Sequence, residues 1–210
     1  MPSSGFDKVL EIYRQRVAAE ARQMHEVHHS ATRPATMHRD ELLLSVGEDV
    51  AQLCVDLIVG RNAQIIVELG TSYGFSTLFL AEAARRTGGK VFTYEIHPDK
   101  QRYAQQHIEM AGLSAQVEWR LGDAVALLAS QPGPIDFVLL DLWKDLYIPC
   151  LDAFYPQLAT NGVIVADNML YPEFSRAEGA AYRAAVRTRT DIEAVLLPIG
   201  QGIDLACRSR

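Results

Sequence analysis

The amino-acid sequence predicts an α/β protein built on a mostly parallel β-sheet, and three observations support this class. From about residue 61, short apolar runs alternate with segments whose apolar residues recur at helical spacing, the pattern of repeated βαβ units. Several apolar runs end directly in glycine or an acidic residue, as strands do at the ligand-binding edge of such a sheet. The last two runs, Ile192–Leu197 and Ile203–Cys207, follow each other without a helix and predict an antiparallel hairpin at the edge of the sheet.

The first 60 residues are expected to form two helices. Apolar residues at helical spacing predict an amphipathic helix over residues 6–28, packed on the main body or on a partner subunit. A second helical pattern runs from Asp40 to Gly60.

From residue 61 onward, strands and helices alternate. The predicted strands before the hairpin are Ile65–Leu69, Val91–Glu95, Val117–Leu121, Ile135–Leu140 and Gly162–Ala166. The predicted helices are Gly74–Arg86, Pro98–Ala111, a short one after Asp123, Ile148–Leu158 and Ala177–Thr188. Because no linker, repeat or low-complexity segment divides the chain, we expect one domain over residues 1–210, with helices in 1–60 and the α/β core in 61–210.

Composition excludes several classes of function. The chain has 210 residues, is 49% hydrophobic and carries a formal net charge of −6, which fits a globular protein and gives no electrostatic reason to expect nucleic acid as a partner. No apolar run approaches the roughly 18 residues that a membrane span requires, and the first residues contain no apolar signal core. The three cysteines form no CxxC pattern, which indicates small core residues in a reducing compartment. We therefore expect a cytoplasmic protein without a membrane partner.

Two predicted strands are followed by polar residues of the kinds that bind metal ions or transfer protons. Asp141 directly follows Ile135–Leu140, with Lys144 three residues later, and Asp167-Asn168 follows Gly162–Ala166. If the two strands are neighbours, Asp141, Asp167 and Asn168 place three oxygen ligands at one spot, with Lys144 beside them. Hard oxygen ligands suit Mg²⁺, Mn²⁺ or Ca²⁺ rather than zinc. Taken singly, each of these residues would be a helix cap, a turn or a surface lysine.

A glycine turn follows the first predicted strand in the sequence VELGTSYGFST, residues 67–77. Gly70 and Gly74 let the backbone turn sharply, and the following helix offers free N–H groups to an anion such as a carboxylate. This is not the dinucleotide fingerprint, which requires glycine where Ser72 stands. Glu95 ends the second strand, where a carboxylate can accept hydrogen bonds from both hydroxyls of a ribose. Asp123 follows the third strand, where a side chain or backbone amide could hydrogen-bond to the edge of an adenine. Together these features predict a nucleoside ligand without a pyrophosphate.

The order of these motifs resembles the S-adenosylmethionine-dependent O-methyltransferases that include catechol O-methyltransferase and the caffeoyl-CoA enzymes. The resemblance covers roughly residues 46–168 and is closest at DLWKDLY, residues 141–147, and ADN, residues 166–168. It implies a Rossmann-like, seven-stranded mixed sheet with helices on both faces and an antiparallel last strand. It also implies S-adenosylmethionine as cofactor, a divalent metal (Mg²⁺ first, Mn²⁺ or Ca²⁺ otherwise) and a homodimer.

The resemblance also implies a role for each site residue. Gly70, Ser72 and Ser76 hold the methionine part of the cofactor, Glu95 holds its ribose, and Ile96, Asp123, Ala124 and Trp143 surround its adenine. Glu68 and Asp141 complete the cofactor set, and the metal ligands are Asp141, Asp167 and Asn168. Lys144 and Asp141 are the catalytic residues: a bound dication lowers the pKa of a phenolic hydroxyl, and Lys144 acts as general base.

The acceptor stays open at this point. A small phenol or catechol is expected, yet Leu142 and Gln201 depart from the pattern of related enzymes, so a non-catechol acceptor or a non-catalytic S-adenosylmethionine-binding protein are alternatives. The acceptor wall is expected from residues 32–44, the 169–176 loop and a partner chain. A nicotinamide oxidoreductase is disfavoured by the missing glycine fingerprint, and methylation of nucleic acid or protein by the acidic balance.

Overall fold

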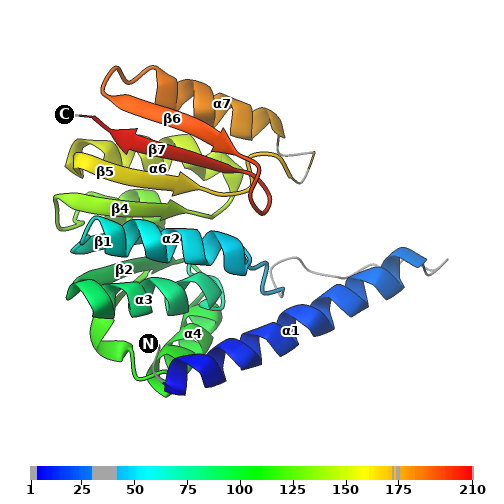
Figure 1. The fold of residues 1–210 in the computed structure, drawn as a ribbon. Helices are drawn as coiled ribbons and strands as arrows, with labels where there is room; N and C mark the ends of the chain where they lie inside the picture. Colours follow the sequence, from blue (N-terminus) through cyan, green and yellow to red (C-terminus); the bar gives the residue numbers. More distant parts are fainter. Residues whose placement is uncertain (1–3, 30–41, 172, 174–175, 210) are drawn as a thin grey trace.

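The computed structural model describes residues 4–29, 42–171, 173 and 176–209, and the side chains of these residues except 4 and 23–29. Within this part of the chain, seven strands form one sheet in the order β3-β2-β1-β4-β5-β7-β6, with helices on both faces (Figure 1). The strands β1 to β5 run parallel, whereas β7 runs antiparallel to both β5 and β6. The predicted fold class is confirmed, including the C-terminal antiparallel hairpin.

The bounds of the elements are as follows. The strands are β1 Ile65–Leu69, β2 Lys90–Glu95, β3 Val117–Leu121, β4 Ile135–Leu140, β5 Leu158–Ala166, β6 Ile192–Leu197 and β7 Ile203–Arg208. The α-helices are α1 Ser4–His29, α2 Glu48–Gly60, α3 Phe75–Thr87, α4 Pro98–Met110, α5 Ala124–Leu128, α6 Tyr147–Phe154 and α7 Arg176–Arg187. Short 3₁₀ turns are η2 Ser114–Gln116, η3 Lys144–Leu146 and η4 Tyr155–Gln157.

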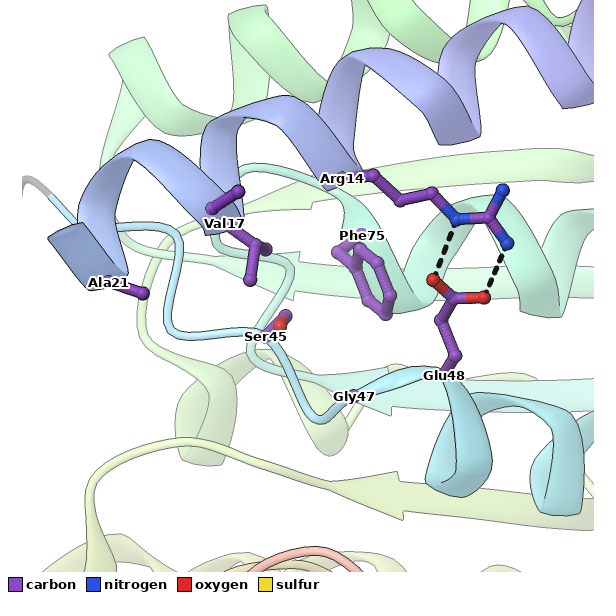
Figure 2. A pocket seen from close by; sticks show the side chains of 8 residues that line it. Arg14, Val17, Ala21, Ser45, Gly47, Glu48 and Phe75 are labelled. Atoms are coloured by element: carbon purple, nitrogen blue, oxygen red, sulfur yellow. Dashed lines mark hydrogen bonds and ion pairs between the residues drawn. The ribbon is translucent and has the colours of Figure 1, made fainter.

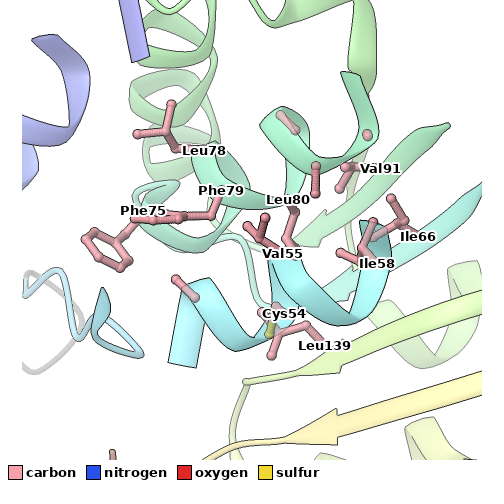
Figure 3. Close-up of a cluster of buried hydrophobic side chains, with 14 of the residues drawn as sticks. Cys54, Val55, Ile58, Ile66, Phe75, Leu78, Phe79, Leu80, Val91 and Leu139 are labelled. Carbon is pink, nitrogen blue, oxygen red and sulfur yellow. The ribbon is translucent and has the colours of Figure 1, made fainter. Parts of the chain in front are cut away.

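The sheet separates two hydrophobic cores. Helices α1 to α4 cover one face, and α5 to α7 cover the other. Because neighbouring residues of a strand point to opposite faces, Ile66 of β1 joins the first core while Val67 joins the second. Figure 3 shows part of the first core, where Ile58 of α2, Leu80 of α3 and Leu139 of β4 are all fully buried. Both faces of the central strands are therefore closed to solvent. Polar side chains that could bind a ligand are consequently confined to the ends of the strands.

Three predicted boundaries were wrong. The helix expected from Asp40 begins at Glu48, because Gly47 has φ 84, outside the helical region, and residues 42–47 are not helical. The helix expected to reach Leu158 ends at Phe154, because Pro156 has no N–H with which to continue the helical hydrogen bonds. Strand β5 consequently begins at Leu158, four residues earlier than the predicted Gly162.

Helix α1 packs on the body through its first half. Phe6, Val9 and Tyr13 are buried in the first core, whereas Val17 is 36% exposed. The second half extends away from the sheet (Figure 1). The predicted amphipathic helix is thus confirmed as one that packs on the main body. None of the helices in the described part of the chain is apolar over a length sufficient to cross a bilayer.

Candidate active site

The C-terminal ends of β1, β4 and β5 meet at one edge of the sheet and bring the predicted reaction residues together. Leu69 pairs with Leu140, and Leu140 pairs with Ala166, so Asp141 and Asp167 follow directly on paired residues. The Asp141 N–H donates to the Leu69 carbonyl at 2.9 Å, and the Asp167 N–H donates to the Leu140 carbonyl at 3.1 Å. Since adjacent strands lie about 4.8 Å apart, the two carboxylates belong to one site.

The turn between β1 and α3 admits only glycine where it meets β4. Gly70 has φ 104, and a Cβ atom there would lie 2.0 Å from the Asp141 carbonyl oxygen. Ser72 and Gly74 also have positive φ angles, of 48 and 90. The N–H groups of Gly70 and Thr71 both donate to the Tyr94 carbonyl, at 3.1 and 3.0 Å. The turn is thus fastened to β2 on one side and pressed against Asp141 on the other.

Glu95, the predicted ribose ligand, is buried and held by backbone N–H groups. Its Oε2 accepts from Ser72 N at 2.8 Å, and its Oε1 accepts from the N–H groups of Ile96 and His97, both at 2.9 Å. Three donors fix one carboxylate, because each of its oxygens has two acceptor sites. Glu95 therefore joins the end of β2 to the glycine turn, and the carboxylate retains acceptor capacity for a ligand hydroxyl.

Glu68 lies in the interior, hydrogen-bonded to α3 and β2. The side chain is fully buried, and its Oε2 accepts from the hydroxyls of Thr77 and Thr93, both at 2.6 Å. Burial raises the pKa of Glu68 to about 7, although hydrogen bonds from Ser76, Thr77 and Thr93 oppose the rise. Its Oε1 has no hydrogen-bond partner among the described residues. Glu68 and Ser76 are both buried next to the turn in the sequence. Their contact with a cofactor stays a prediction.

The residues predicted around adenine form the outer rim of the same edge. Asp123 is exposed and caps α5, since its Oδ1 accepts from Ala126 N at 3.0 Å. Ile96 and Trp143 are 60% and 50% exposed, although both are large and apolar. Exposed apolar side chains at a strand edge are available to a flat ring, and Ala124 at the start of α5 adds no bulk. Their contact with adenine stays a prediction.

The chemistry of the site is concentrated in Asp141, Asp167 and Lys144. Burial raises the pKa of both carboxyl groups, and for Asp167 the neighbouring charge of Asp141 raises it further. Burial lowers the pKa of Lys144 to about 8, while the two carboxylates oppose that shift. Lys144 Nζ donates to the Asp167 carbonyl oxygen at 2.7 Å and lies 3.6 Å from the centre of the Tyr147 ring. The buried Asp167 and the partly buried Asp141 thus share one nearby lysine.

Asn168 completes a possible oxygen site. Asp167 Oδ1 accepts from the Asn168 N–H at 2.7 Å, and Oδ2 accepts from the Asn168 side-chain amide at 3.3 Å. Asn168 has φ 57, a left-handed conformation that asparagine tolerates. The described residues contain no group of three or more His, Cys, Asp or Glu side chains that could hold a metal ion. A metal at this place would therefore need the amide oxygen of Asn168 beside Asp141 and Asp167.

The expected acceptor wall is only partly described. The N–H groups of Leu170 and Tyr171 donate to the Gln201 carbonyl at 2.9 and 3.1 Å, which ties the loop after β5 to the turn before β7. Met169 is buried, whereas Tyr171 is 54% exposed. Residues 32–41, Pro172 and Phe174, which were also expected in this wall, lie outside the described residues.

Sequence reasoning missed three supporting residues. Thr77 and Thr93 hold Glu68, and Tyr147 lies under Lys144 with its hydroxyl donating to the Asp167 carbonyl at 3.2 Å. For Tyr147, only its place three residues after Lys144 hints at this contact. The threonines gave no signal, because threonine at these positions also fits an ordinary strand or helix.

Comparison with known proteins shows which enzymes this chain is similar to. Residues 67–169 match the family described as "Methyltransferase domain". A catechol O-methyltransferase of Niastella koreensis is 34% identical over 125 residues, which cover 58% of this chain and 53% of that protein. A caffeoyl-CoA O-methyltransferase of Eucalyptus globulus is 27% identical over 79% of this chain and 75% of its own length. The chain thus spans about half the length of the catechol O-methyltransferases of Niastella koreensis and Bos taurus.

A solved structure has the same fold over the whole chain. The O-methyltransferase TomG of Streptomyces achromogenes, solved in complex with SAM, has a TM-score of 0.77 and 20% identity and covers 100% of this chain and 92% of its own. The resemblance deduced from the sequence is therefore confirmed, with the match to the methyltransferase domain over residues 67–169.

Proposed function

We infer that this relative of the catechol and caffeoyl-CoA O-methyltransferases transfers a methyl group from S-adenosylmethionine to a hydroxyl of a small phenolic or catechol-like acceptor. The observation that carries the proposal is the meeting of Asp141, Asp167 and Lys144 beside the Gly70 turn, at one edge of the sheet. The names of the relatives agree with this reaction class.

The residues present fit S-adenosylmethionine. A Cβ atom on Gly70 would collide with the Asp141 carbonyl, so glycine keeps the turn close to the end of β4, and no side-chain hydrogen bond caps the start of α3 at Gly74. A helix start without a side-chain cap suits the methionine carboxylate, and Glu95 has acceptor capacity for the ribose hydroxyls. S-adenosylmethionine supplies a methyl group on a positively charged sulfur, a good leaving group. The chain's own task is to hold an acceptor oxygen in line with that methyl.

The residues also fit a hard divalent cation. Burial raises the pKa of Asp141 and Asp167, the charge of Asp141 raises that of Asp167 further, one lysine lies nearby to neutralise them, and Asn168 adds a neutral oxygen. Asp141, Asp167 and Asn168 would hold the ion, with Mg²⁺ as first choice and Mn²⁺ or Ca²⁺ as the others. Such an ion lowers the pKa of a coordinated hydroxyl and fixes its place.

Lys144 is the proposed general base. Its lowered pKa, about 8, leaves a fraction of the amine neutral near pH 7, and a neutral amine can take the proton of a phenolic hydroxyl. The phenolate oxygen would then bond to the methyl carbon as the carbon–sulfur bond of S-adenosylmethionine breaks, with S-adenosylhomocysteine as the leaving product. Tyr147 and the Asp167 carbonyl keep Lys144 facing the site.

A methyl-transfer screen tests the proposal. Catechols, flavonoids and caffeoyl esters are offered with S-adenosylmethionine, with and without Mg²⁺, and S-adenosylhomocysteine is measured. We expect formation of methylated product that depends on the cation. If S-adenosylmethionine binds but no acceptor in the screen is methylated, the non-catalytic alternative or a different acceptor class replaces this proposal.

A further inference from the structure

We propose that residues 13–20 of α1 are a clamp on the cofactor turn, with Tyr13, Arg16 and Glu20 as positioning residues that set the affinity for S-adenosylmethionine. The inference rests on the proposed function, because it takes residues 70–74 as part of the cofactor site. It assigns a task to a helix whose sequence suggested only packing.

The first contact of the clamp is made by Tyr13. This side chain is fully buried, and its hydroxyl donates to the backbone carbonyl of Tyr73 at 2.7 Å. A Cβ atom on Gly74 would lie 3.0 Å from the same hydroxyl oxygen, so α1 presses directly on the turn. Tyr13 therefore fixes the peptide between Tyr73 and Gly74, immediately before α3 begins.

The second contact reaches the turn through the segment after residue 41. The Arg16 guanidinium lies 3.8 Å from the centre of the Tyr73 ring, and its Nε donates to Glu20 at 2.8 Å. Glu20 in turn accepts from the Leu43 N–H at 2.8 Å, and the Leu43 carbonyl accepts from the Ser72 hydroxyl at 3.3 Å. Ser72, Tyr73 and Gly74 are thus each held by α1 or by a group bound to it.

The turn needs such support because its backbone is unfavourable alone. Ser72 has φ 48, and a non-glycine residue in the left-handed region persists only when its surroundings fix it. Ser72 N also donates to Glu95, so movement of the turn would disturb the predicted ribose ligand. A loosened clamp would therefore weaken both the methionine end and the ribose end of the cofactor site.

The grip of α1 on this region is local. A cavity of about 300 Å³ lies between α1 and residues 45–48 and is lined by Val17, Ser45, Phe75 and others (Figure 2). Across it, Arg14 and Glu48 form an ion pair at 2.7 Å, but both side chains are about half exposed, so the pair adds little stability. Tyr13, Arg16 and Glu20 consequently carry the connection, and point substitutions there can release the turn without removing the helix.

Tyr13→Phe tests the clamp, because it removes one hydroxyl and keeps the ring in the core. Isothermal titration with S-adenosylmethionine should show affinity about 3- to 10-fold weaker, the range expected for one lost hydrogen bond. At saturating S-adenosylmethionine, kcat should stay within about twofold of wild type, since Tyr13 takes no part in the proton transfer proposed for Lys144. Tyr155→Phe is the matched control, because it loses a hydrogen bond to Asp191 outside the site and should leave the affinity unchanged.

A double-mutant cycle tests the second contact. If Glu20 acts through Leu43 on Ser72, Glu20→Ala should weaken S-adenosylmethionine binding in the wild type and have little further effect in Ser72→Ala. By linkage, S-adenosylmethionine should slow hydrogen exchange of the Leu43 amide, and less so in Tyr13→Phe. If the wild type binds S-adenosylmethionine and the affinity is unchanged in both Tyr13→Phe and Glu20→Ala, the clamp is overturned while the proposed function stands. Failure of the wild type to bind S-adenosylmethionine would instead overturn the proposed function.

Discussion

The two halves of the candidate site differ in how far the protein satisfies its own polar groups. In the cofactor half, Glu95 accepts three backbone N–H groups, and the Gly70 turn is tied to β2. In the reaction half, burial raises the pKa of Asp141 and Asp167, and lowers that of Lys144. Burying charges without full compensation is unfavourable, so such an arrangement is typical of functional sites. The polar groups of the cofactor half are thus satisfied by the protein itself, whereas in the reaction half the proposed cation would supply the missing compensation.

Removal of Lys144 should give the largest effect and is confined to the reaction half. Lys144→Ala is expected to lower turnover by about 10³-fold or more, near the upper part of the range for a general base. Affinity for S-adenosylmethionine should stay within a few-fold, because the Lys144 amine contacts the Asp167 carbonyl and Tyr147 rather than the Gly70 turn. Turnover is measured as S-adenosylhomocysteine formed, and affinity by titration.

Lys90→Ala is the matched control for this change. Lys90 lies at the start of β2 and forms only a loose, half-exposed pair with Glu118 at 3.5 Å, so its loss should leave turnover unaltered. Loss of cofactor binding in Lys144→Ala would mean that the lysine belongs to the cofactor half, and the contrast between the halves would then be wrongly drawn.

Removal of divalent cations should have the next largest effect. EDTA is expected to lower turnover by about 100-fold, and Mg²⁺ to restore it, because a cation contributes several kcal/mol to such a reaction. Mg²⁺ should also raise the melting temperature of the free protein, since an ion that binds only the folded state stabilises it.

The effect on the melting temperature separates the proposed ligands from other carboxylates. Asp167→Asn should abolish the rise in melting temperature with Mg²⁺, whereas Asp191→Asn should keep it, because Asp191 pairs with Arg208 outside the site. Full turnover in EDTA would remove the cation from the reaction half, and Asp141 and Asp167 would then need another source of compensation.

In the cofactor half, Glu95→Gln should weaken binding without removing the chemistry. An amide has one oxygen where the carboxylate has two, so one of the hydrogen bonds from Ser72, Ile96 and His97 must be lost. Affinity for S-adenosylmethionine should fall about 10-fold or somewhat more, as expected for hydrogen bonds to a charged group. At saturating S-adenosylmethionine, turnover should return to near the wild-type value, and the exposed Glu118→Gln serves as control.

Much of this contrast could be predicted from sequence because it depends on strand order. Residues that end parallel strands share an edge, so the neighbourhood of Gly70, Glu95, Asp141 and Asp167 follows once the strands are recognised. Their roles as ligands and bases stay predictions, and so does the single domain over residues 1–210.

The rest depends on contacts between elements distant in the chain. Tyr13 reaches a carbonyl 60 positions away, and nothing in the pattern of α1 distinguishes this tyrosine from an ordinary core residue. The start of α2 was missed for a related reason. Leu43 and Val46 are buried as helix residues would be, so the apolar pattern extends to residues before Gly47. The helical backbone itself begins only after Gly47.

Tyr147→Phe should have the smallest effect and decides what holds Lys144 in the reaction half. The substitution removes the hydroxyl that donates to the Asp167 carbonyl at 3.2 Å but keeps the ring 3.6 Å from the lysine amine. The Asp167 carbonyl still accepts from Lys144, so no buried acceptor is left without a partner. We expect the free energy of unfolding to fall by about 1 kcal/mol and turnover to change by less than about threefold. A loss of turnover approaching that of Lys144→Ala would show that the hydroxyl, and not the ring, positions the base, and the Asp167 carbonyl would then become the central anchor of this half.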